Sequence, residues 1–454
     1  MIVVSHRGPV TFDTASDGSF TGSRGAGGVV SGLLPLVAGS DHATWIAAAM
    51  TDGDSAATRA GQAAVDGVDL RLLLLDAHEH RLHYDVVSNA TLWFLHHGLY
   101  DLPRRPSFDR RFEEAWDAYV AVNEAFARET AAVATPGEVV LVQDYHLTLV
   151  PGMVRAQRSD CRVVHFTHTP FCEPSSARVL PEAVSRVMLT SMGGVQCGFH
   201  TSRWADAYLA TSRMVLGKAG AGARAFVAPL GPDPGALAET ASSEAARSEA
   251  SQLDELAHGR AIVLRVDRIE PSKNIVRGFQ AFDLVLHEHP RWRERVVFVA
   301  LLTPSRERQA EYLAYRAEVE RAAARVNERW ATPTWQPVVL DTRDDYARSV
   351  GALGRYDVLL VNPVRDGLNL IAKEGPLLNE KAGVVCLSRE AGSFDELRDA
   401  VLEVHPFDII QTASALLEAL EMPATERAAR ADRLRTLAAA RDPAGWLADL
   451  VAHA

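Results

Sequence analysis

The sequence is poor in cysteine and has no long apolar run. Its four cysteines are Cys161, Cys172, Cys197 and Cys386. They are widely spaced and form no CxxC pair, so they give no support for a zinc site or a disulfide framework. No apolar stretch reaches the roughly eighteen residues of a membrane-spanning helix. The opening residues, MIVVSHRGP, form a short strand pattern without the basic and apolar regions of a signal peptide. We therefore expect a cytoplasmic protein without a membrane partner.

The chain also lacks an excess of positive charge. Its formal net charge is -11, which argues against a nucleic-acid-binding surface. Any site for an anionic ligand must therefore be a local cluster of basic residues.

The chain has 454 residues, which is more than a single hydrophobic core usually organises, so we expect two domains. Short apolar runs such as Ile2–Val4, Val139–Val142 and Ala261–Val266 alternate with helical patterns, which is typical of parallel α/β sheets. The charged stretch Pro229–Ala257 interrupts this alternation, so we predict domains at residues 1–238 and 239–454. A last helix after Asp442 is a candidate for packing back onto the first domain.

A glycine-rich segment, SRGAGGVVSGLLPLV, precedes an apolar helix. Gly25, Gly27 and Gly28 would let the backbone approach a ligand, and the N-terminus of the helix would offer free N–H groups to a phosphate. The alternative is a loop that uses glycine only for turn geometry. Both interpretations stay open at this point.

A second candidate anion site follows the strand pattern that ends at Val266. Arg268 and Lys273 lie five residues apart beside the predicted start of a helix near Asn274, with Ser272 as its predicted cap. Arginine can bind a phosphate bidentately and lysine adds a mobile charge. The alternative is a pair of solvated surface charges.

The stretch VNPVRDGLNLIAKE leaves an apolar strand and enters a helix. Asp366, Gly367 and Asn369 would present polar groups at the start of that helix, and Glu374 could accept the hydroxyls of a ribose or a sugar. The alternative is a capped helix with surface charges.

Two further polar segments, QDYHL and HFTHTPF, follow apolar runs. Asp144, His146, His165 and His168 could form a polar site. The spacing matches no common zinc motif, so we do not expect a metal. For each histidine alone, the alternative is a buried ring that is hydrogen-bonded to the backbone.

Taken together, these motifs resemble the trehalose-6-phosphate synthase family, glycosyltransferase family 20, over nearly the whole chain. The resemblance also rests on SHR at the N-terminus, LW at Leu92-Trp93, GFHT at residues 198–201, RIEPSK, and TPSR at residues 303–306. It implies the GT-B fold, in which two Rossmann-like parallel-sheet domains face a cleft. It also implies transfer of a hexose (glucose), with retention of configuration, from a UDP- or GDP-linked sugar to a phosphorylated acceptor, with α,α-trehalose 6-phosphate as the default product. No metal or other cofactor is implied.

The resemblance assigns roles to individual residues. The implied catalytic residues are Arg268, Lys273, Asp366 and His168. The implied donor-binding residues are Gly28, Arg268, Lys273, Asp366, Gly367, Asn369, Leu370 and Glu374. The implied acceptor-binding residues are Arg7, Tyr84, Trp93, Asp144 and Arg306.

Some positions depart from the family pattern. LWPxFHYR becomes LWFLHHGLY, with Phe94, Leu95 and Gly98 at changed positions, and WFGW becomes WIAA, which ends at Ala48. VERLDYSKG becomes VDRIEPSKN, with Glu270, Pro271 and Asn274 as the changed residues. We expect the requirement for a phosphorylated acceptor to survive and strict selectivity for glucose to weaken or shift.

Three alternatives stay open at this point. One is a glucosylglycerol-phosphate synthase, and another is a validamycin-type pseudoglycosyltransferase that couples a nucleotide cyclitol to an aminocyclitol phosphate. The third is an inactive regulatory homologue that binds sugar phosphates, against which the intact Arg268, Lys273, Asp366 and Glu374 argue. A homo-oligomer is also left open.

Overall fold

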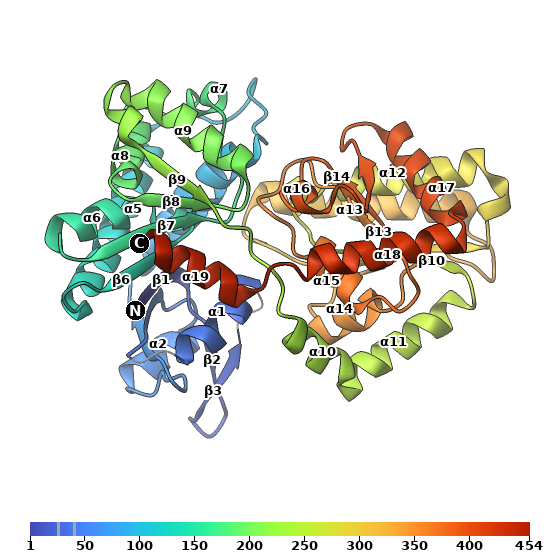
Figure 1. Ribbon diagram of the computed structural model, residues 1–454, viewed down its shortest axis with the longest axis horizontal. Coiled ribbons are helices and arrows are strands. Elements are labelled where there is room, and N and C mark those ends of the chain that lie inside the picture. The colour runs from blue at the N-terminus through green and yellow to red at the C-terminus, as the bar shows by residue number, and fades with distance from the viewer. Residues whose placement is uncertain (25–27, 40–41) are drawn as a thin grey trace. The chain divides into compact units, whose positions relative to one another are not determined.

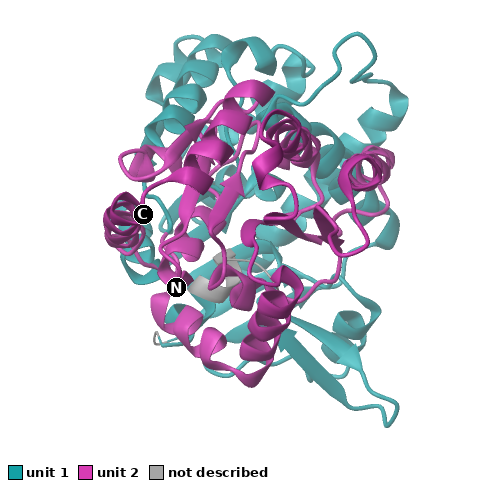
Figure 2. Ribbon diagram, turned by 90° about the vertical axis from the view of Figure 1, so that its right-hand side faces the viewer, with its two compact units in different colours: residues 1–230, 443–454 teal, residues 231–442 magenta. Residues whose placement is uncertain are grey.

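The computed structural model describes residues 1–24, 28–39 and 42–454. These residues form two compact units (Figures 1 and 2). Unit 1 comprises Met1–Leu230 and Pro443–Ala454, and unit 2 comprises Gly231–Asp442. The division falls after Leu230, whereas the sequence placed the boundary after residue 238, and the last twelve residues belong to unit 1.

Unit 1 is built on a seven-stranded sheet with the order β5-β4-β1-β6-β7-β8-β9 among the described residues. Every neighbouring pair in this sheet is parallel. The central strands are buried on both faces, which explains why they are continuous apolar runs in the sequence. The strands are β1 (Ile2–Arg7), β4 (Thr44–Ala48), β5 (Asp69–Leu73), β6 (Val139–Gln143), β7 (Arg162–Thr167), β8 (Gln196–Phe199) and β9 (Arg224–Val227).

The remaining elements of unit 1 are a hairpin and the helices. The antiparallel hairpin pairs β2 (Val10–Thr14) with β3 (Phe20–Arg24). The described helices are α1 (Gly28–Ala38), α2 (Asp52–Arg59), α3 (Ala77–Arg81), the π-helix η1 (Leu82–Trp93), α4 (Phe94–His97), α5 (Arg110–Val133), η2 (Tyr145–Leu147), α6 (Val150–Gln157), α7 (Pro174–Ala177), α8 (Glu182–Gly193), α9 (Ser202–Leu216), η3 (Ala219–Gly222) and α19 (Pro443–His453).

The last helix, α19, packs on α1 and β7 of unit 1, and Figure 2 gives it the colour of that unit. Trp446 is fully buried, with its ring edge-on to Phe166 at 5.0 Å between centroids. Near the end of the helix, Arg162 Nη2 donates to the carbonyl of Val451 at 3.1 Å. A buried tryptophan thus fixes the C-terminal residues to the sheet of unit 1.

Unit 2 holds a six-stranded sheet with the order β12-β11-β10-β13-β14-β15, again with parallel pairs. One hydrophobic cluster contains Phe279 and Phe298 and the other contains Leu264 and Leu359. The strands are β10 (Ala261–Arg268), β11 (Val296–Thr303), β12 (Val338–Asp341), β13 (Val358–Val361), β14 (Val384–Ser388) and β15 (Leu402–Val404). The helices are α10 (Pro234–Ser242), α11 (Glu244–Ala257), η4 (Pro271–Lys273), α12 (Ile275–Glu288), η5 (Pro290–Trp292), α13 (Ala310–Trp330), α14 (Tyr346–Leu353), α15 (Ile371–Leu378), α16 (Phe394–Leu397), α17 (Ile409–Glu421) and α18 (Ala424–Ala438).

The predicted cap of α12 is wrong. Ser272 lies inside the short helix η4, and α12 begins at Ile275 with Asn274 as its N-cap residue. Asn274 has a φ of 60°, in the left-handed region, and its side chain makes no cap hydrogen bond to α12. It donates instead to the backbone carbonyls of Asn362 and Pro406, at 3.0 and 2.6 Å. The asparagine therefore fixes the loop to neighbouring segments and tolerates a conformation that glycine would also adopt.

Among the described residues, no helix has the length and apolar character needed to cross a membrane.

Candidate active site

In unit 2 the candidate residues follow the carboxyl ends of neighbouring strands. The parallel pairing of β10 with β11 continues to Arg268 opposite Thr303, and β13 on the other side of β10 ends at Val361, shortly before Asp366. The loops after these strands therefore leave the sheet at the same edge. Ligands of open parallel sheets bind at that edge.

Lys273 and Asp366 form the centre of this group. Lys273 Nζ lies 2.5 Å from Asp366 Oδ2, and Asn369 Nδ2 donates to the same oxygen at 3.1 Å. Burial opposes the charge of Lys273, but Asp366 and Asp267 attract it, and the net effect raises the pKa of Lys273. The lysine is therefore a fixed cation beside a carboxylate that can accept sugar hydroxyls.

A second ion pair lies next to the first. Arg265 and Asp267 are almost completely buried, with 2.9 Å between Nε and Oδ2. Burial raises the pKa of Asp267, and Arg265 and then Lys273 partly counteract that rise. Sequence reasoning missed this pair, although both side chains lie on the same strand as Arg268.

Arg268 is the exposed cation of the group. Its side chain retains 57% of its accessible surface, and Nη1 lies 3.2 Å from Glu270 Oε1. The charge of Glu270 raises the pKa of Arg268. Arg306 also faces Glu270, at 3.9 Å, and donates to the hydroxyl of Tyr312. The structure thus brings an implied donor residue and an implied acceptor residue together within unit 2.

Glu374 lies in the first turn of α15. Burial raises its pKa to about 7. Its backbone N–H donates to the carbonyl of Leu370 at 2.8 Å, and Asn369 Oδ1 accepts from the N–H of Ala372 at 3.3 Å. The start of α15 is therefore held by its own polar groups, next to the Lys273–Asp366 pair. Gly367 lies on the same turn between Asp366 and Leu368.

In unit 1, Arg7 and Tyr84 form one polar group. Arg7 ends β1, and its Nη2 donates to the hydroxyl of Tyr84 at 2.8 Å. His6 stacks on Tyr84 and on His146, with centroids 4.8 and 5.0 Å apart. Burial keeps the pKa of His6 well below its ordinary value. An aromatic stack that contains a neutral His6 thus supports the two residues that the family resemblance assigns to the acceptor phosphate.

His168 follows β7 in a chain of hydrogen bonds. The N–H of Leu230 lies 3.4 Å from His200 Nδ1, His200 Nε2 lies 3.1 Å from His168 Nδ1, and His168 Nε2 lies 2.9 Å from Gln143 Oε1. Since Leu230 N–H can only donate, these contacts are consistent with donation from Nε2 in both histidines. Burial lowers the pKa of His168 to about 3, so the ring is neutral at pH 7.

Asp144 binds the backbone next to His168. Its Oδ1 accepts from the N–H of His168 at 3.2 Å, and Oδ2 lies 3.9 Å from His146 Nδ1. His165 Nε2 lies 3.2 Å from the carbonyl of Asp144. The four polar residues singled out in QDYHL and HFTHTPF therefore form one cluster. Gln143 and His200 belong to the same cluster through their contacts with His168. Neither was singled out from the sequence as a site residue, although each lies at the carboxyl end of a strand.

Of the implied site residues, Trp93 is buried in the core, and Gly28 borders a segment outside the described residues. Trp93 is 2% exposed and its ring stacks on His97 at 4.1 Å, so the indole is part of the core. Gly28 is the first residue of α1, and Gly25 and Gly27 lie outside the described residues.

The changed family positions have local structural reasons. Phe94 and Leu95 are buried, and Ala48 is buried at the end of β4. Gly98 follows α4 with a φ of 65°, which is the left-handed conformation typical of a residue that ends a helix.

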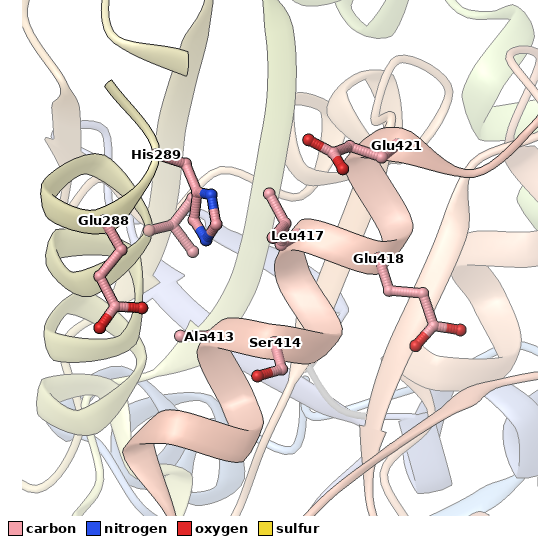
Figure 3. A pocket seen from close by; sticks show the side chains of 8 residues that line it. Glu288, His289, Ala413, Ser414, Leu417, Glu418 and Glu421 are labelled. Carbon is pink, nitrogen blue, oxygen red and sulfur yellow. The ribbon is translucent and has the colours of Figure 1, made fainter. Parts of the chain in front are cut away.

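A small hollow of about 190 Å³ lies elsewhere in unit 2, between α12 and α17 (Figure 3). Glu288, Glu418 and Glu421 surround it, which makes it unsuited to an anionic substrate. It contains none of the implied site residues. Within the described ranges, no group of three or more His, Cys, Asp or Glu side chains has the geometry of a metal site.

The family is shown by comparison with known proteins. The model of Glycosyltransferase family 20 matches residues 1–454. The chain therefore belongs to glycosyltransferase family 20, and the expected fold class, with two Rossmann-like parallel-sheet domains, is confirmed.

Individual relatives agree with this assignment. The trehalose-6-phosphate synthase of Mycolicibacterium smegmatis is 32% identical over 98% of this chain and 90% of its own length. A bifunctional trehalose-6-phosphate synthase/phosphatase of Thermoproteus tenax is 30% identical over 99% of this chain, which spans 63% of that relative.

Solved structures are similar over almost the whole chain. The UDP-forming α,α-trehalose-phosphate synthase of Burkholderia xenovorans in complex with glucose-6-phosphate has a TM-score of 0.85 and 25% identity, and covers 99% of both chains. An E. coli protein bound with UDP-2-fluoro glucose has a TM-score of 0.84 and 25% identity, and covers 99% of this chain and 98% of its own.

Proposed function

We propose that this glycosyltransferase transfers glucose from UDP-glucose to glucose 6-phosphate, with retention, and forms α,α-trehalose 6-phosphate. The observation that carries the proposal is the group formed by Lys273, Asp366 and Asn369, with Arg268 on the same loop as Lys273. It places cations beside a hydroxyl-accepting carboxylate, as a sugar diphosphate requires. The named relatives favour this reaction over glucosylglycerol-phosphate or pseudoglycosyl transfer.

Each residue has a chemical task in this reaction. As the bond between the sugar and the diphosphate breaks, negative charge grows on the leaving diphosphate, and Arg268 and Lys273 stabilise it. Asp366 and the Asn369-Leu370 backbone hold the donor hydroxyls, and Glu374 holds the ribose. Positive charge develops on the sugar ring, and a neutral His168 beside it adds no repulsion.

Arg7, Tyr84 and Arg306 bind the phosphate of the acceptor, and Asp144 binds its hydroxyls. Arginine suits a phosphate because its guanidinium group binds the oxygens bidentately. The acceptor attacks from the face that the diphosphate leaves, and the leaving phosphate takes the acceptor proton. The proposed reaction requires no metal.

The experiment is a matrix of donors and acceptors. The purified protein is incubated with UDP-glucose or GDP-glucose and with glucose 6-phosphate, glycerol 3-phosphate, a cyclitol phosphate or free glucose, and the products are identified by mass spectrometry. We expect a disaccharide phosphate from UDP-glucose and glucose 6-phosphate. Use of free glucose as well as any phosphorylated acceptor would contradict the assignment of the phosphate-binding residues. Exclusive and efficient use of glucose 6-phosphate would overturn the expected shift in acceptor selectivity.

A further inference from the structure

Glu270 lies where two loops of unit 2 leave the sheet side by side. β10 and β11 pair in parallel up to Arg268 and Thr303, and the N–H of Ile269 then donates to the carbonyl of Thr303 at 2.8 Å. The loop after β10 carries Glu270, and the loop after β11 carries Ser305 and Arg306. Register alone therefore brings the carboxylate close to cations on both loops.

The carboxylate of Glu270 contacts side chains from both loops. Glu270 as a whole is 1% exposed to solvent. Oε1 lies 3.2 Å from Arg268 Nη1 and 3.9 Å from Arg306 Nη1, and it accepts from Ser305 Oγ at 3.1 Å. A carboxylate this deeply buried needs cationic and hydrogen-bonding partners to remain ionised. Each of the two loops supplies Glu270 with a cation, Arg268 from one and Arg306 from the other.

The two arginines repel each other and are held differently. The charge of Arg306 lowers the pKa of Arg268, whereas Glu270 raises it by a larger amount. Arg306 is 11% exposed in its side chain and also binds Tyr312 from α13, while Arg268 is 57% exposed. Glu270 therefore holds Arg268 near its buried side and leaves much of the guanidinium accessible.

We propose that Glu270 is a positioning residue that holds Arg268 and Arg306 in a fixed mutual orientation for transfer. The proposal rests on the proposed function, because it assigns Arg268 to the donor diphosphate and Arg306 to the acceptor phosphate. The carboxylate shared by Arg268 and Arg306 fixes the orientation of both guanidinium groups and offsets part of their positive charge. It therefore favours alignment of donor and acceptor for transfer, and it lowers the affinity for their phosphate groups.

This role has a signature that a merely structural residue would lack. In Glu270→Gln the negative charge is lost, so the two cations attract a diphosphate more strongly, and uridine diphosphate should bind about three- to tenfold tighter. The cations are no longer aligned, so kcat with UDP-glucose and glucose 6-phosphate should fall about 100-fold. Affinity and turnover thus change in opposite directions.

Two further variants separate charge from position. Glu270→Asp keeps the charge but withdraws the carboxylate by one methylene, so affinity for uridine diphosphate should stay within about twofold. Its kcat should fall about tenfold, between the wild type and Glu270→Gln. Asp357→Asn is the matched control. Like Glu270, Asp357 is a carboxylate of unit 2 that pairs with an arginine, but it is only partly buried and precedes β13, at the other end of the strand from the candidate site.

The experiment measures uridine diphosphate binding by calorimetry and steady-state kinetics on the full chain, after thermal unfolding has shown which variants fold. The expected result is tighter binding with slower turnover in Glu270→Gln, and neither change in Asp357→Asn. Unchanged or weaker binding in Glu270→Gln, or an unchanged kcat, would overturn the proposal. If Glu270→Gln does not fold, Glu270→Asp decides, because a wild-type kcat or a shifted affinity there contradicts the role. Absence of transfer by the wild-type protein contradicts the proposed function itself, whereas normal turnover by the variants of an active enzyme contradicts only the role of Glu270.

Discussion

Arg268 and Lys273 belong to one loop but work in different surroundings. Lys273 is almost buried and paired with Asp366, while Arg268 is more than half exposed. In the proposed function, the fixed Lys273 and the accessible Arg268 would share the stabilisation of the leaving diphosphate. Both charges are already in place before a ligand binds, which lowers the cost of reorganisation during the reaction.

The first prediction concerns Arg268. In Arg268→Ala the activation free energy of transfer should rise by about 2–4 kcal/mol, the range for losing one preorganised donor. The measurement is kcat/KM with UDP-glucose. Arg316→Ala, which removes a partly exposed arginine of α13 paired with Glu320, is the control. Near-normal turnover in Arg268→Ala would show that the assignment is wrong.

The second prediction concerns Glu374, whose pKa burial raises to about 7. An ionised carboxylate accepts hydroxyl hydrogen bonds better than a neutral one, so the KM for UDP-glucose should fall as the pH rises from about 6 to 8. Glu374→Gln should remove this dependence, whereas Glu380→Gln, at an exposed acid just beyond α15, should leave it unchanged. A wild-type KM that does not vary with pH would contradict the role of Glu374.

The same raised pKa also affects folding. The folded state favours protonated Glu374, so this contribution to the free energy of unfolding is fully present below pH 4.5 and is lost as the pH rises through about 7. Ionisation of Glu374 at higher pH thus makes unit 2 slightly less stable.

At the scale of the elements, Asn274 stabilises the conformation of the loop between β10 and α12. Asn274→Ala loses three side-chain hydrogen bonds, two to backbone carbonyls and one from Arg277, and strains the left-handed backbone, so the free energy of unfolding should fall by about 2–4 kcal/mol. Asn274→Gly removes the hydrogen bonds but suits the positive φ, so it should cost about half as much. Urea denaturation measures both values, and an equal loss in the two variants would refute the contribution of backbone strain.

Most central strands of both sheets could be predicted from the sequence, because each is a short apolar run between polar turns. The predicted runs Ile2–Val4, Val139–Val142 and Ala261–Val266 lie within β1, β6 and β10. The strands Thr44–Ala48 and Gln196–Phe199 were not identified, since alanine, glycine and polar residues hide a buried strand. The hairpin β2–β3 was also missed, because its strands are polar and exposed at several positions.

The candidate site could be predicted only in part. Arg268, Lys273, Asp366 and Glu374 were identified from their place after strands and from the family resemblance. The contacts between them could not be predicted, because the 2.5 Å pair of Lys273 and Asp366 joins residues from two loops of the sheet. For the same reason the bridging contacts of Glu270 were missed, since they depend on the register of β10 and β11.

At the scale of the whole molecule, the two units should respond differently to acid. Burial lowers the pKa values of His83, His165 and His168 in unit 1 to about 3, 4 and 3. A lowered pKa means that the unfolded state binds protons first, so stability is lost as the pH falls from 6.5 towards these values. Each of the three histidines should cost up to about 2 kcal/mol at pH 5.

Hydrogen exchange measured by mass spectrometry at pH 7 and pH 5, corrected for the intrinsic pH dependence of exchange, can resolve the two units. Peptides from β6 and β7 should lose protection at pH 5, while peptides from β10 and β11 should change less. Equal losses in both units would contradict the assignment of the acid sensitivity to the buried histidines.

The central claim is retaining transfer of glucose to a phosphorylated sugar, and proton NMR of the reaction with UDP-α-glucose and glucose 6-phosphate tests it most directly. We predict one product in which the newly formed glycosidic bond has the α configuration at the anomeric carbon from the donor, with release of uridine diphosphate. A β configuration at that carbon, or hydrolysis of UDP-glucose without transfer, would contradict the account.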